Sequence, residues 1–160
     1  MFTILCLTRY EPSGPSSRYR FYQFLPFLEK ENFDVTVSPL FNEYYINNLF
    51  SENRPQVVLH AAAYKHVPIQ ELNPWYAVLT NVAGTQNIVE CAHDYSVEKF
   101  ILVSTDKAVH PINVMGATKR LSERIIQTID KVSHTQFMAV RFGNVIGSSG
   151  SVIPTLKRQI

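Results

Sequence analysis

The chain has 160 residues, of which 46% are hydrophobic and 18% are charged, and its formal net charge is +2. This length allows one domain with a sizeable core, and the balanced composition is that of an ordinary globular protein. The small net charge and the absence of a basic stripe argue against a nucleic-acid partner, and no apolar run approaches the roughly 20 residues that span a bilayer. The first residues lack the features of a signal peptide, so we expect a cytoplasmic protein with no membrane segment.

Short apolar runs rich in β-branched residues alternate with helical patterns along the chain. We predict strands at 3–8, 33–38, 57–60, 100–103 and 136–141, and helices at 18–30, 43–51, 74–94 and 113–132. Within these helices Pro26 is expected to produce a kink, whereas Asn73 and Asn113 are expected to serve as amino-terminal caps. Alternation of strands and helices predicts right-handed crossovers. The expected fold class is α/β: a Rossmann-like, doubly wound parallel sheet of about five strands, with helices on both faces.

The two cysteines, Cys6 and Cys91, lie in a predicted strand and a predicted helix, far apart in the sequence. They lack the spacing of metal ligands, so we expect reduced thiols in the core and no metal site. Among the histidines, His60 ends the third predicted strand, and we interpret it as a hydrogen-bonded strand-end residue rather than a ligand.

The segment after the first strand lacks the usual signature of a dinucleotide-binding sheet. Such sheets carry G-x-G-x-x-G at this point, which lets backbone amides approach a pyrophosphate. Here only Gly14 occurs, between Ser13 and Pro15, and the proline removes a backbone donor. The serines and the start of the next helix can still hold an anion. Two interpretations therefore remain open, a phosphate-binding loop and a plain structural turn.

Polar residues follow the fourth predicted strand, at the sheet edge where ligands bind in open parallel sheets. Thr105, Asp106 and Lys107 stand there, and the next predicted helix carries Met115 and Lys119. The last two are four residues apart and share one helical face. The pattern predicts that a hydroxyl, a carboxylate and two ammonium groups converge on one pocket.

Five motifs occur in order: RPQVVLHAAAYKHVP (54–68), NPWYAVLTNVAGTQN (73–87), STDKAV (104–109), NVMGATK (113–119) and RFGNVIGSSGSVIP (141–154). They closely resemble those of the extended short-chain dehydrogenase/reductases that act as nucleotide-sugar 4,6-dehydratases, namely UDP-N-acetylglucosamine 4,6-dehydratases and CapD-like polysaccharide biosynthesis proteins. Residues 1–50 instead resemble the amino terminus of a bacterial glycosyltransferase. The two resemblances predict a single Rossmann-like domain, 1–160, with a join near 45–54. The family has a later substrate-binding part, so we expect a sheet truncated at the carboxyl end and an impaired enzyme.

The resemblance implies NAD or NADP as the cofactor and a UDP-linked N-acetylhexosamine as the substrate. The resemblance also implies catalytic roles: Lys119 holds the nicotinamide ribose, and Thr105 bonds the reacting sugar hydroxyl. Asp106 protonates the departing C6 hydroxyl while Lys107 takes the C5 proton. Met115 stands where the superfamily usually has tyrosine, and methionine has no ionisable proton. Large dehydratases of this branch share the methionine, so the resemblance favours pocket lining over the core role that the residue type alone suggests.

Two further groups of residues are expected near the cofactor. Ala61, Ala62 and Ala63 follow the third strand, and their small side chains allow either close approach of the cofactor or close packing of a helix on the sheet. Asn81 either bridges the backbone and the active-site water or lies on a helix surface.

The expected substrate contacts are Lys65, His66 and Asn144. Lys65 and His66 follow a strand end and either meet the substrate phosphate or sugar or form a solvated loop. Asn144 either faces the nucleotide-sugar or forms a turn. Two other functions remain open, a glycosyltransferase-like sugar-nucleotide-binding module and a non-catalytic fragment that self-associates. A homo-oligomer is compatible with each function.

Overall fold

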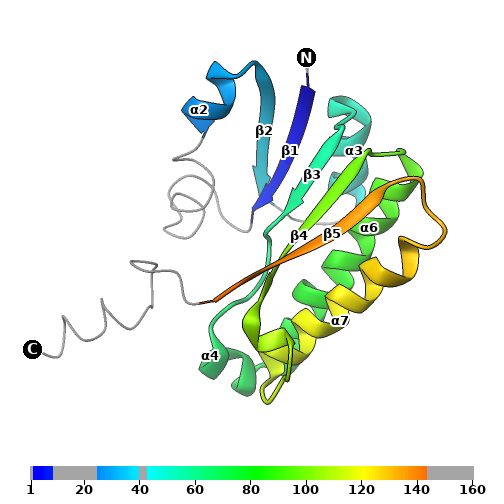
Figure 1. Ribbon diagram of the computed structural model, residues 1–160. Helices are drawn as coiled ribbons and strands as arrows, with labels where there is room; N and C mark the ends of the chain where they lie inside the picture. The colour runs from blue at the N-terminus through cyan, green and yellow to red at the C-terminus, as the bar shows by residue number, and fades with distance from the viewer. Residues whose placement is uncertain (1, 9–24, 40–42, 144–160) are drawn as a thin grey trace, which may run out of the picture.

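A computed structural model describes residues 2–8, 25–39 and 43–143, and every structural statement below concerns these residues (Figure 1). Five strands form one sheet: β1 (Phe2–Thr8), β2 (Phe33–Pro39), β3 (Val57–His60), β4 (Lys99–Thr105) and β5 (Gln136–Phe142). All neighbours pair in parallel, in the order β2-β1-β3-β4-β5. The predicted α/β class and parallel sheet are confirmed.

The helices are α2 (Leu25–Lys30), α3 (Glu43–Asn53), α4 (Val67–Leu72), α5 (Pro74–Ala77), α6 (Gly84–Asp94) and α7 (Val114–Ile129). A π-helix, η2 (Val78–Ala83), joins α5 to α6, and a short 3₁₀ turn, η3 (Asp106–Ala108), follows β4. In Figure 1, α3, α6 and α7 lie side by side along the sheet, and α6 packs against both α3 and α7. Since β2 and β3 lie on either side of β1, right-handed connections would put α2 and α3 on opposite faces of the sheet.

The core lies between the sheet and the layer formed by α3, α6 and α7. Val58 of β3 and Phe100 and Leu102 of β4 are fully buried because alternate residues of a strand point to the same face. The helices contribute Ile46, Phe50, Ile88, Val89 and Ile126 to the same cluster. Phe100 also stacks against Phe137 of β5, with ring centroids 5.2 Å apart. This packing fixes the helices over the strand ends that carry the predicted site.

The sequence predicted helix caps at Asn73 and Asn113 and a kink at Pro26, and the structure confirms one of the two caps. Asn113 caps α7 as predicted, since its Oδ1 accepts from the Gly116 amide at 2.7 Å. The predicted cap at Asn73 is wrong, because its side chain donates instead to the Ile69 carbonyl at 3.0 Å and so closes α4, a helix that the sequence pattern did not reveal. The described part of the first helix begins at Leu25, which places Pro26 in the first turn; the expected kink within 18–30 involves residues outside the description.

Both cysteines are free thiols in the core, as predicted. Cys6 is fully buried in β1, and burial raises the pKa of its thiol to about 12. Such a thiol stays protonated and inert at neutral pH. Within the described ranges, no helix combines the length and the apolar character that a membrane crossing requires.

Candidate active site

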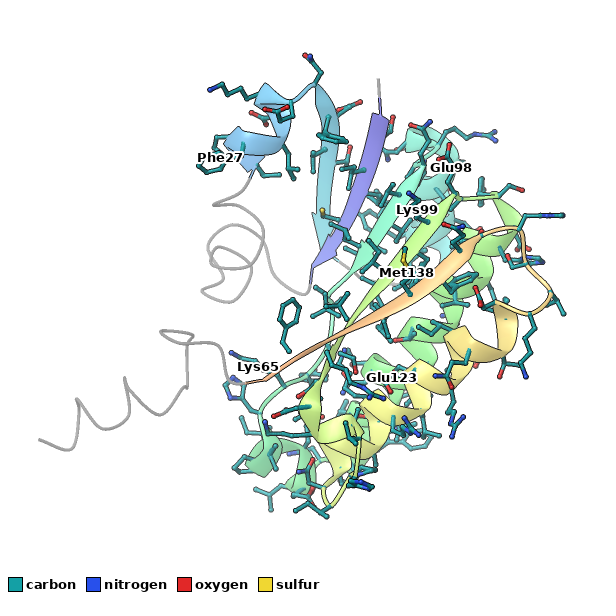
Figure 2. The ribbon with its side chains drawn as sticks, viewed as in Figure 1. Phe27, Lys65, Glu98, Lys99, Glu123 and Met138 are labelled. Atoms are coloured by element: carbon teal, nitrogen blue, oxygen red, sulfur yellow. The ribbon has the colours of Figure 1, made fainter. Side chains whose placement is uncertain are left out.

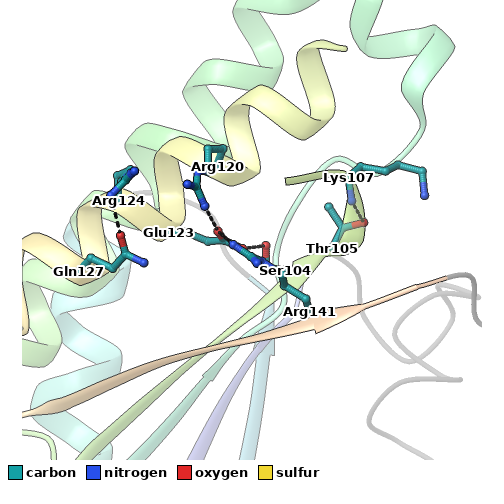
Figure 3. Close-up of polar contacts among 8 residues, drawn as sticks. All are labelled: Ser104, Thr105, Lys107, Arg120, Glu123, Arg124, Gln127 and Arg141. Carbon is teal, nitrogen blue, oxygen red and sulfur yellow. Dashed lines mark hydrogen bonds and ion pairs between the residues drawn. The ribbon is translucent and has the colours of Figure 1, made fainter. Parts of the chain in front are cut away.

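The carboxyl end of β4 turns directly into η3, and Thr105 organises this turn. Its Oγ1 accepts from the Lys107 amide at 3.4 Å, which caps η3 (Figure 3). The same hydroxyl donates to Asp106 Oδ1 at 2.9 Å. Three residues that the sequence predicted for the site are therefore brought together within one turn of backbone.

Asp106 and Lys107 form an ion pair that is open to solvent. Lys107 Nζ lies 3.2 Å from Asp106 Oδ1, and the two side chains are 39% and 54% exposed respectively. The hydrogen bond from Thr105, followed by that from Lys107, lowers the pKa of Asp106 below its ordinary value. Asp106 is therefore a carboxylate at neutral pH, held beside the Lys107 side chain. An acid and a base in contact, and accessible from outside, can act on the same small molecule.

Helix α7 begins against this turn because Gly116 carries no side chain. A Cβ added there would lie 2.5 Å from the Lys107 carbonyl oxygen, so only glycine lets the two backbones approach so closely. The amino terminus of α7 is held further by Glu71 of α4, whose carboxylate accepts from the Val114 amide at 2.6 Å. A carboxylate at this position also complements the helix dipole.

Met115 and Lys119 lie on the buried face of α7, as their four-residue spacing predicted. Met115 is 5% and Lys119 7% exposed. Lys119 Nζ donates to the Val103 carbonyl of β4 at 2.8 Å. The ammonium group is thus fixed two residues before Thr105, the last residue of β4, from which η3 begins.

Asn81 is fully buried and anchors the loop after β3 to α7. Its side-chain amide accepts from the Tyr64 amide at 2.7 Å, donates to the Tyr64 carbonyl at 3.2 Å, and donates to Thr118 Oγ1 at 3.0 Å. It projects from η2, the π-helical segment Val78–Ala83, and such segments often occur at functional sites. The interpretation as a helix-surface asparagine is wrong, while its cofactor role stays a prediction.

His60, at the end of β3, is confirmed as a hydrogen-bonded core residue. Its Nε2 lies 3.0 Å from Thr85 Oγ1, whose hydroxyl donates to the Asn81 carbonyl at 2.6 Å. Because that hydroxyl proton is committed, Nε2 must carry the imidazole hydrogen and donate. Nδ1 is then a buried acceptor with no hydrogen-bond partner among the described residues. Burial, together with the positive charge of Lys119, lowers the pKa of His60 to about 3.

The other predicted contacts follow β3 or lie outside the description. Ala62 is buried, whereas Ala61 and Ala63 are half-buried. Lys65 is half-buried and His66 exposed, on the loop between β3 and α4 on which Figure 2 labels Lys65. Asn144 and the loop around Gly14 lie outside the described residues. The predicted roles of these residues in binding cofactor or substrate stay predictions.

Sequence reasoning missed a buried ionic cluster around Glu123 of α7 (Figure 3). Ser104 donates to Glu123 Oε1 at 2.6 Å, and Arg141 donates to both carboxylate oxygens at 2.9 and 2.7 Å. Arg120 lies 3.4 Å from Oε2. Burial alone would raise the pKa of Glu123, but the bonds from Arg141 and Ser104 outweigh it and hold the pKa below its ordinary value. One signal was available: Glu123 follows Lys119 by four residues and so shares its helical face.

In the described part of the chain, no three His, Cys, Asp or Glu side chains gather in a way that could hold a metal ion. The groups that the structure places at this edge are a hydroxyl, an exposed carboxylate–ammonium pair and a buried ammonium group. The sequence profile of a family described as "Polysaccharide biosynthesis protein" matches residues 21–160. The chain belongs to this family. The match begins before the predicted join near 45–54, which stays a prediction.

Relatives within the family have related descriptions. The chain is 58% identical over 112 residues to a probable polysaccharide biosynthesis protein EpsC of Bacillus subtilis, covering 70% of this chain and 19% of that protein. It is 47% identical over 150 residues to the capsular polysaccharide biosynthesis protein CapD of Staphylococcus aureus, covering 92% and 25%. It is 38% identical over 138 residues to an inverting UDP-N-acetylglucosamine 4,6-dehydratase of Campylobacter jejuni, covering 78% and 41%. The chain thus spans less than half of each of these relatives.

Solved structures agree with the fold. Pen from Bacillus thuringiensis superposes with a TM-score of 0.76 at 31% identity, over 99% of this chain and 55% of that one. A dTDP-4-dehydrorhamnose reductase from Bacillus anthracis, solved in complex with NADP, superposes with a TM-score of 0.79 at 22% identity, over 99% and 59%. At that identity the second likeness establishes the Rossmann-like fold alone. The comparisons therefore establish a polysaccharide biosynthesis family and a Rossmann-like fold for this chain.

Proposed function

We propose that this chain forms the cofactor-binding and catalytic part of an NAD(P)-dependent UDP-N-acetylhexosamine 4,6-dehydratase of surface-polysaccharide biosynthesis. The observation that carries the proposal is the solvent-open Asp106–Lys107 pair, with 3.2 Å between Nζ and Oδ1. Thr105 bonds directly to this pair, and Lys119 is anchored to the same strand. The family membership and the similarity to a UDP-N-acetylglucosamine 4,6-dehydratase support the same function.

The carboxyl edge of the sheet fits a nicotinamide dinucleotide in its residue types. Small alanine side chains at 61–63 follow β3, and the Lys119 ammonium group lies at the end of β4, where it can bond ribose hydroxyls. When bound, the nicotinamide supplies reversible oxidation of the sugar.

Removal of water across C5 and C6 needs a base for the C5 proton and an acid for the C6 hydroxyl. The resting pair holds the opposite protonation, a carboxylate beside an ammonium group. Transfer of one proton from Lys107 to Asp106 produces a neutral amine and a neutral acid without changing the net charge. Lys107 then takes the C5 proton, and Asp106 gives its proton to the departing hydroxyl, which leaves as water. These two transfers restore the original ion pair, so the side chains are ready for the next turnover.

Thr105 is suited to orient the sugar. Its hydroxyl already contacts Asp106 at 2.9 Å, so a sugar hydroxyl bonded to Thr105 lies beside the acid. Lys119 is 7% exposed and bonded to the Val103 carbonyl, which keeps its charge in place during the reaction. The side chains that exchange protons are accessible, while the charge that holds the cofactor is buried.

The proposal is tested first by calorimetric titration of the chain with NAD⁺ and NADP⁺. Calorimetry is preferable to fluorescence because Trp75 is 68% exposed on α5 and is poorly placed to report on the sheet edge. Saturable binding at micromolar concentration is expected for one of the two cofactors. Absence of binding up to millimolar concentration would contradict the proposal for this chain and favour a sugar-nucleotide module or a non-catalytic fragment.

The second test is turnover of UDP-N-acetylglucosamine in D₂O, followed by NMR. The expected product is the 4-keto-6-deoxy sugar nucleotide, formed slowly because this chain is expected to be an impaired enzyme. Deuterium is expected at C5, introduced through exchange at Lys107. Lys107→Met is expected to lower both product formation and C5 exchange about a thousandfold while cofactor binding remains. Product formation by this variant at the original rate would remove Lys107 from the mechanism.

A further inference from the structure

The Glu123 carboxylate is buried, and both of its oxygens accept hydrogen bonds. Its side chain is 2% exposed, yet it accepts hydrogen bonds from Ser104, from Nε and Nη2 of Arg141, and a longer one from Arg120. A buried ion pair adds little net stability because desolvation offsets most of the attraction. Bonds of this kind are directional, however, and a bidentate arginine fixes both distance and angle. The cluster is therefore better suited to fixing geometry than to stabilising the fold.

The groups that Glu123 holds are neighbours across two strands. Ser104 and Arg141 are paired residues in the β4–β5 ladder, and the next pair is Thr105 with Phe142. Glu123 therefore reaches from α7 to the rung immediately before the catalytic turn. Both Ser104 and Arg141 contact the same oxygen, Oε1, at 2.6 and 2.9 Å, so a single carboxylate ties the two strand ends together.

The same bonds set the position of α7 along β4. Lys119 bonds the Val103 carbonyl, and Glu123, one helical turn later, bonds the Ser104 hydroxyl. Two attachment points one turn apart define both the axial position and the rotation of the helix. They therefore determine where Lys119 lies relative to the turn that begins at Thr105.

We infer that Glu123 is a positioning residue: through Ser104 and Arg141 it holds the Thr105–Asp106–Lys107 turn in register with Lys119. The geometric part of this inference stands on the contacts alone, whereas its catalytic consequence rests on the proposed function. Glu123 touches neither the sugar nor the acid–base pair in this arrangement, and it acts through the two residues that it bonds.

The first test compares hydrogen exchange of the free chain with that of Glu123→Gln and Ser104→Ala. Both variants are expected to accelerate exchange of amides 103–107 about tenfold, the effect of losing one hydrogen bond to a charged group. Exchange in β3, residues 57–60, is expected to stay unchanged. The matched control is Glu90→Gln, since Glu90 is an exposed carboxylate on α6 that bonds Gln86 at 2.9 Å. This control is expected to exchange as the original chain does.

The second test compares the effects of each variant on kcat and on KM. Rates are expressed per cofactor-binding site, so that unfolded protein does not contribute. Glu123→Gln is expected to lower kcat about tenfold with little change in KM, because it misplaces the proton-transferring groups rather than the binding surface. Arg141→Lys keeps the charge but lacks the planar fork, so the same split is expected. A merely structural role would reduce the number of binding sites and leave kcat per site unchanged.

The outcomes separate the inference from the proposed function. Unchanged exchange at 103–107 in both Glu123→Gln and Ser104→Ala overturns the positioning role, whatever the enzyme does. If the original chain binds no cofactor and makes no product, the proposed function fails, and the exchange data still decide the geometric claim. If Glu123→Gln does not fold, Ser104→Ala decides it, because that change removes a single hydroxyl group.

Discussion

Two ion pairs flank the end of β4, and they differ in exposure. In the Asp106–Lys107 pair the two side chains are 54% and 39% exposed, whereas the Glu123 side chain, bonded to Arg141, is 2% exposed. An exposed pair contributes little to stability, since water screens it and each side chain keeps alternative partners. That weakness suits chemistry, because a substrate can displace one partner and a proton can move. Arg141 is 39% exposed, as Lys107 is, so the two pairs differ in their carboxylates. The buried Glu123 carboxylate exchanges partners with difficulty and so suits positioning.

The sharpest test of this contrast is Asp106→Asn or Lys107→Met. Either change is expected to lower kcat by about a thousandfold, the range for loss of a general acid or base. The free energy of unfolding is expected to change by less than about 1 kcal/mol, because the pair is exposed. Turnover and urea unfolding measured on the same samples check both expectations. A large loss of stability would show that this pair, too, has a structural role.

Arg141→Ala tests the Glu123–Arg141 pair, for which the expected effect is a loss of stability. It leaves the Glu123 carboxylate buried without its bidentate partner, and stranding a buried ion costs about 3 kcal/mol. Glu123→Ala is expected to cost less, because Arg141 is 39% exposed and its guanidinium group can reach water. Urea unfolding of the two variants shows which of them loses more free energy of unfolding. Equal losses would indicate that the carboxylate is better hydrated than its 2% exposure suggests.

Gly116→Ala tests the contact between α7 and the catalytic turn. The new Cβ would meet the Lys107 carbonyl oxygen at 2.5 Å, so the helix or the turn must shift. We expect a loss of about 2 kcal/mol, typical of overpacking, together with reduced turnover. The matched control is Gly143→Ala, where the added Cβ would make an ordinary contact, 3.9 Å from Asp106 Oδ2. If both variants lose the same free energy of unfolding, the close approach of Gly116 to the Lys107 backbone does not explain the effect.

A more gradual effect is a pH dependence caused by His60. Its pKa is about 3 in the folded chain and about 6.5 when unfolded, so the unfolded state binds more protons below pH 6.5. Above pH 6.5 His60 therefore does not lower the free energy of unfolding. Below it, the free energy of unfolding falls by about 1.4 kcal/mol per pH unit as the pH drops toward 3. The lowered carboxyl groups Asp106 and Glu123 act in the same direction, but only nearer their ordinary values of 3.8 and 4.5. A His60→Gln variant that keeps the slope between pH 6.5 and 5 would exclude this cause.

Several elements could be predicted because their signals are local. The strand at Val57–His60 and the helix that Asn113 caps were recognised from apolar runs and from a side chain that bonds its own neighbours. Met115 and Lys119 share a face because four residues span about one helical turn. The placement of Thr105, Asp106 and Lys107 at the end of β4 followed from a general property of parallel sheets, whose carboxyl edge collects the polar ends of the strands.

Other features could not be predicted, because competing local signals are resolved by tertiary contacts. Asn73 has the residue type and position of a helix cap, yet its amide closes the preceding helix α4 by bonding Ile69. The π-helical segment Val78–Ala83 interrupts a pattern that reads as one regular helix. The Asn81 carbonyl of this segment accepts from Ser122 of α7 at 2.6 Å, a contact 41 residues away in sequence.

The sequence alone determined the succession of strands and helices, the family motifs, and the identity of the groups at the carboxyl edge. Hydrophobic periodicity and short-range hydrogen bonding are properties of neighbouring residues, so they can be read along the chain. The tertiary structure alone decided that Glu123 would meet Arg141, 18 residues further on, and that Gly116 would touch the Lys107 backbone. These contacts depend on how α7 docks across the β4–β5 register, and that docking is set by the packing of the whole core.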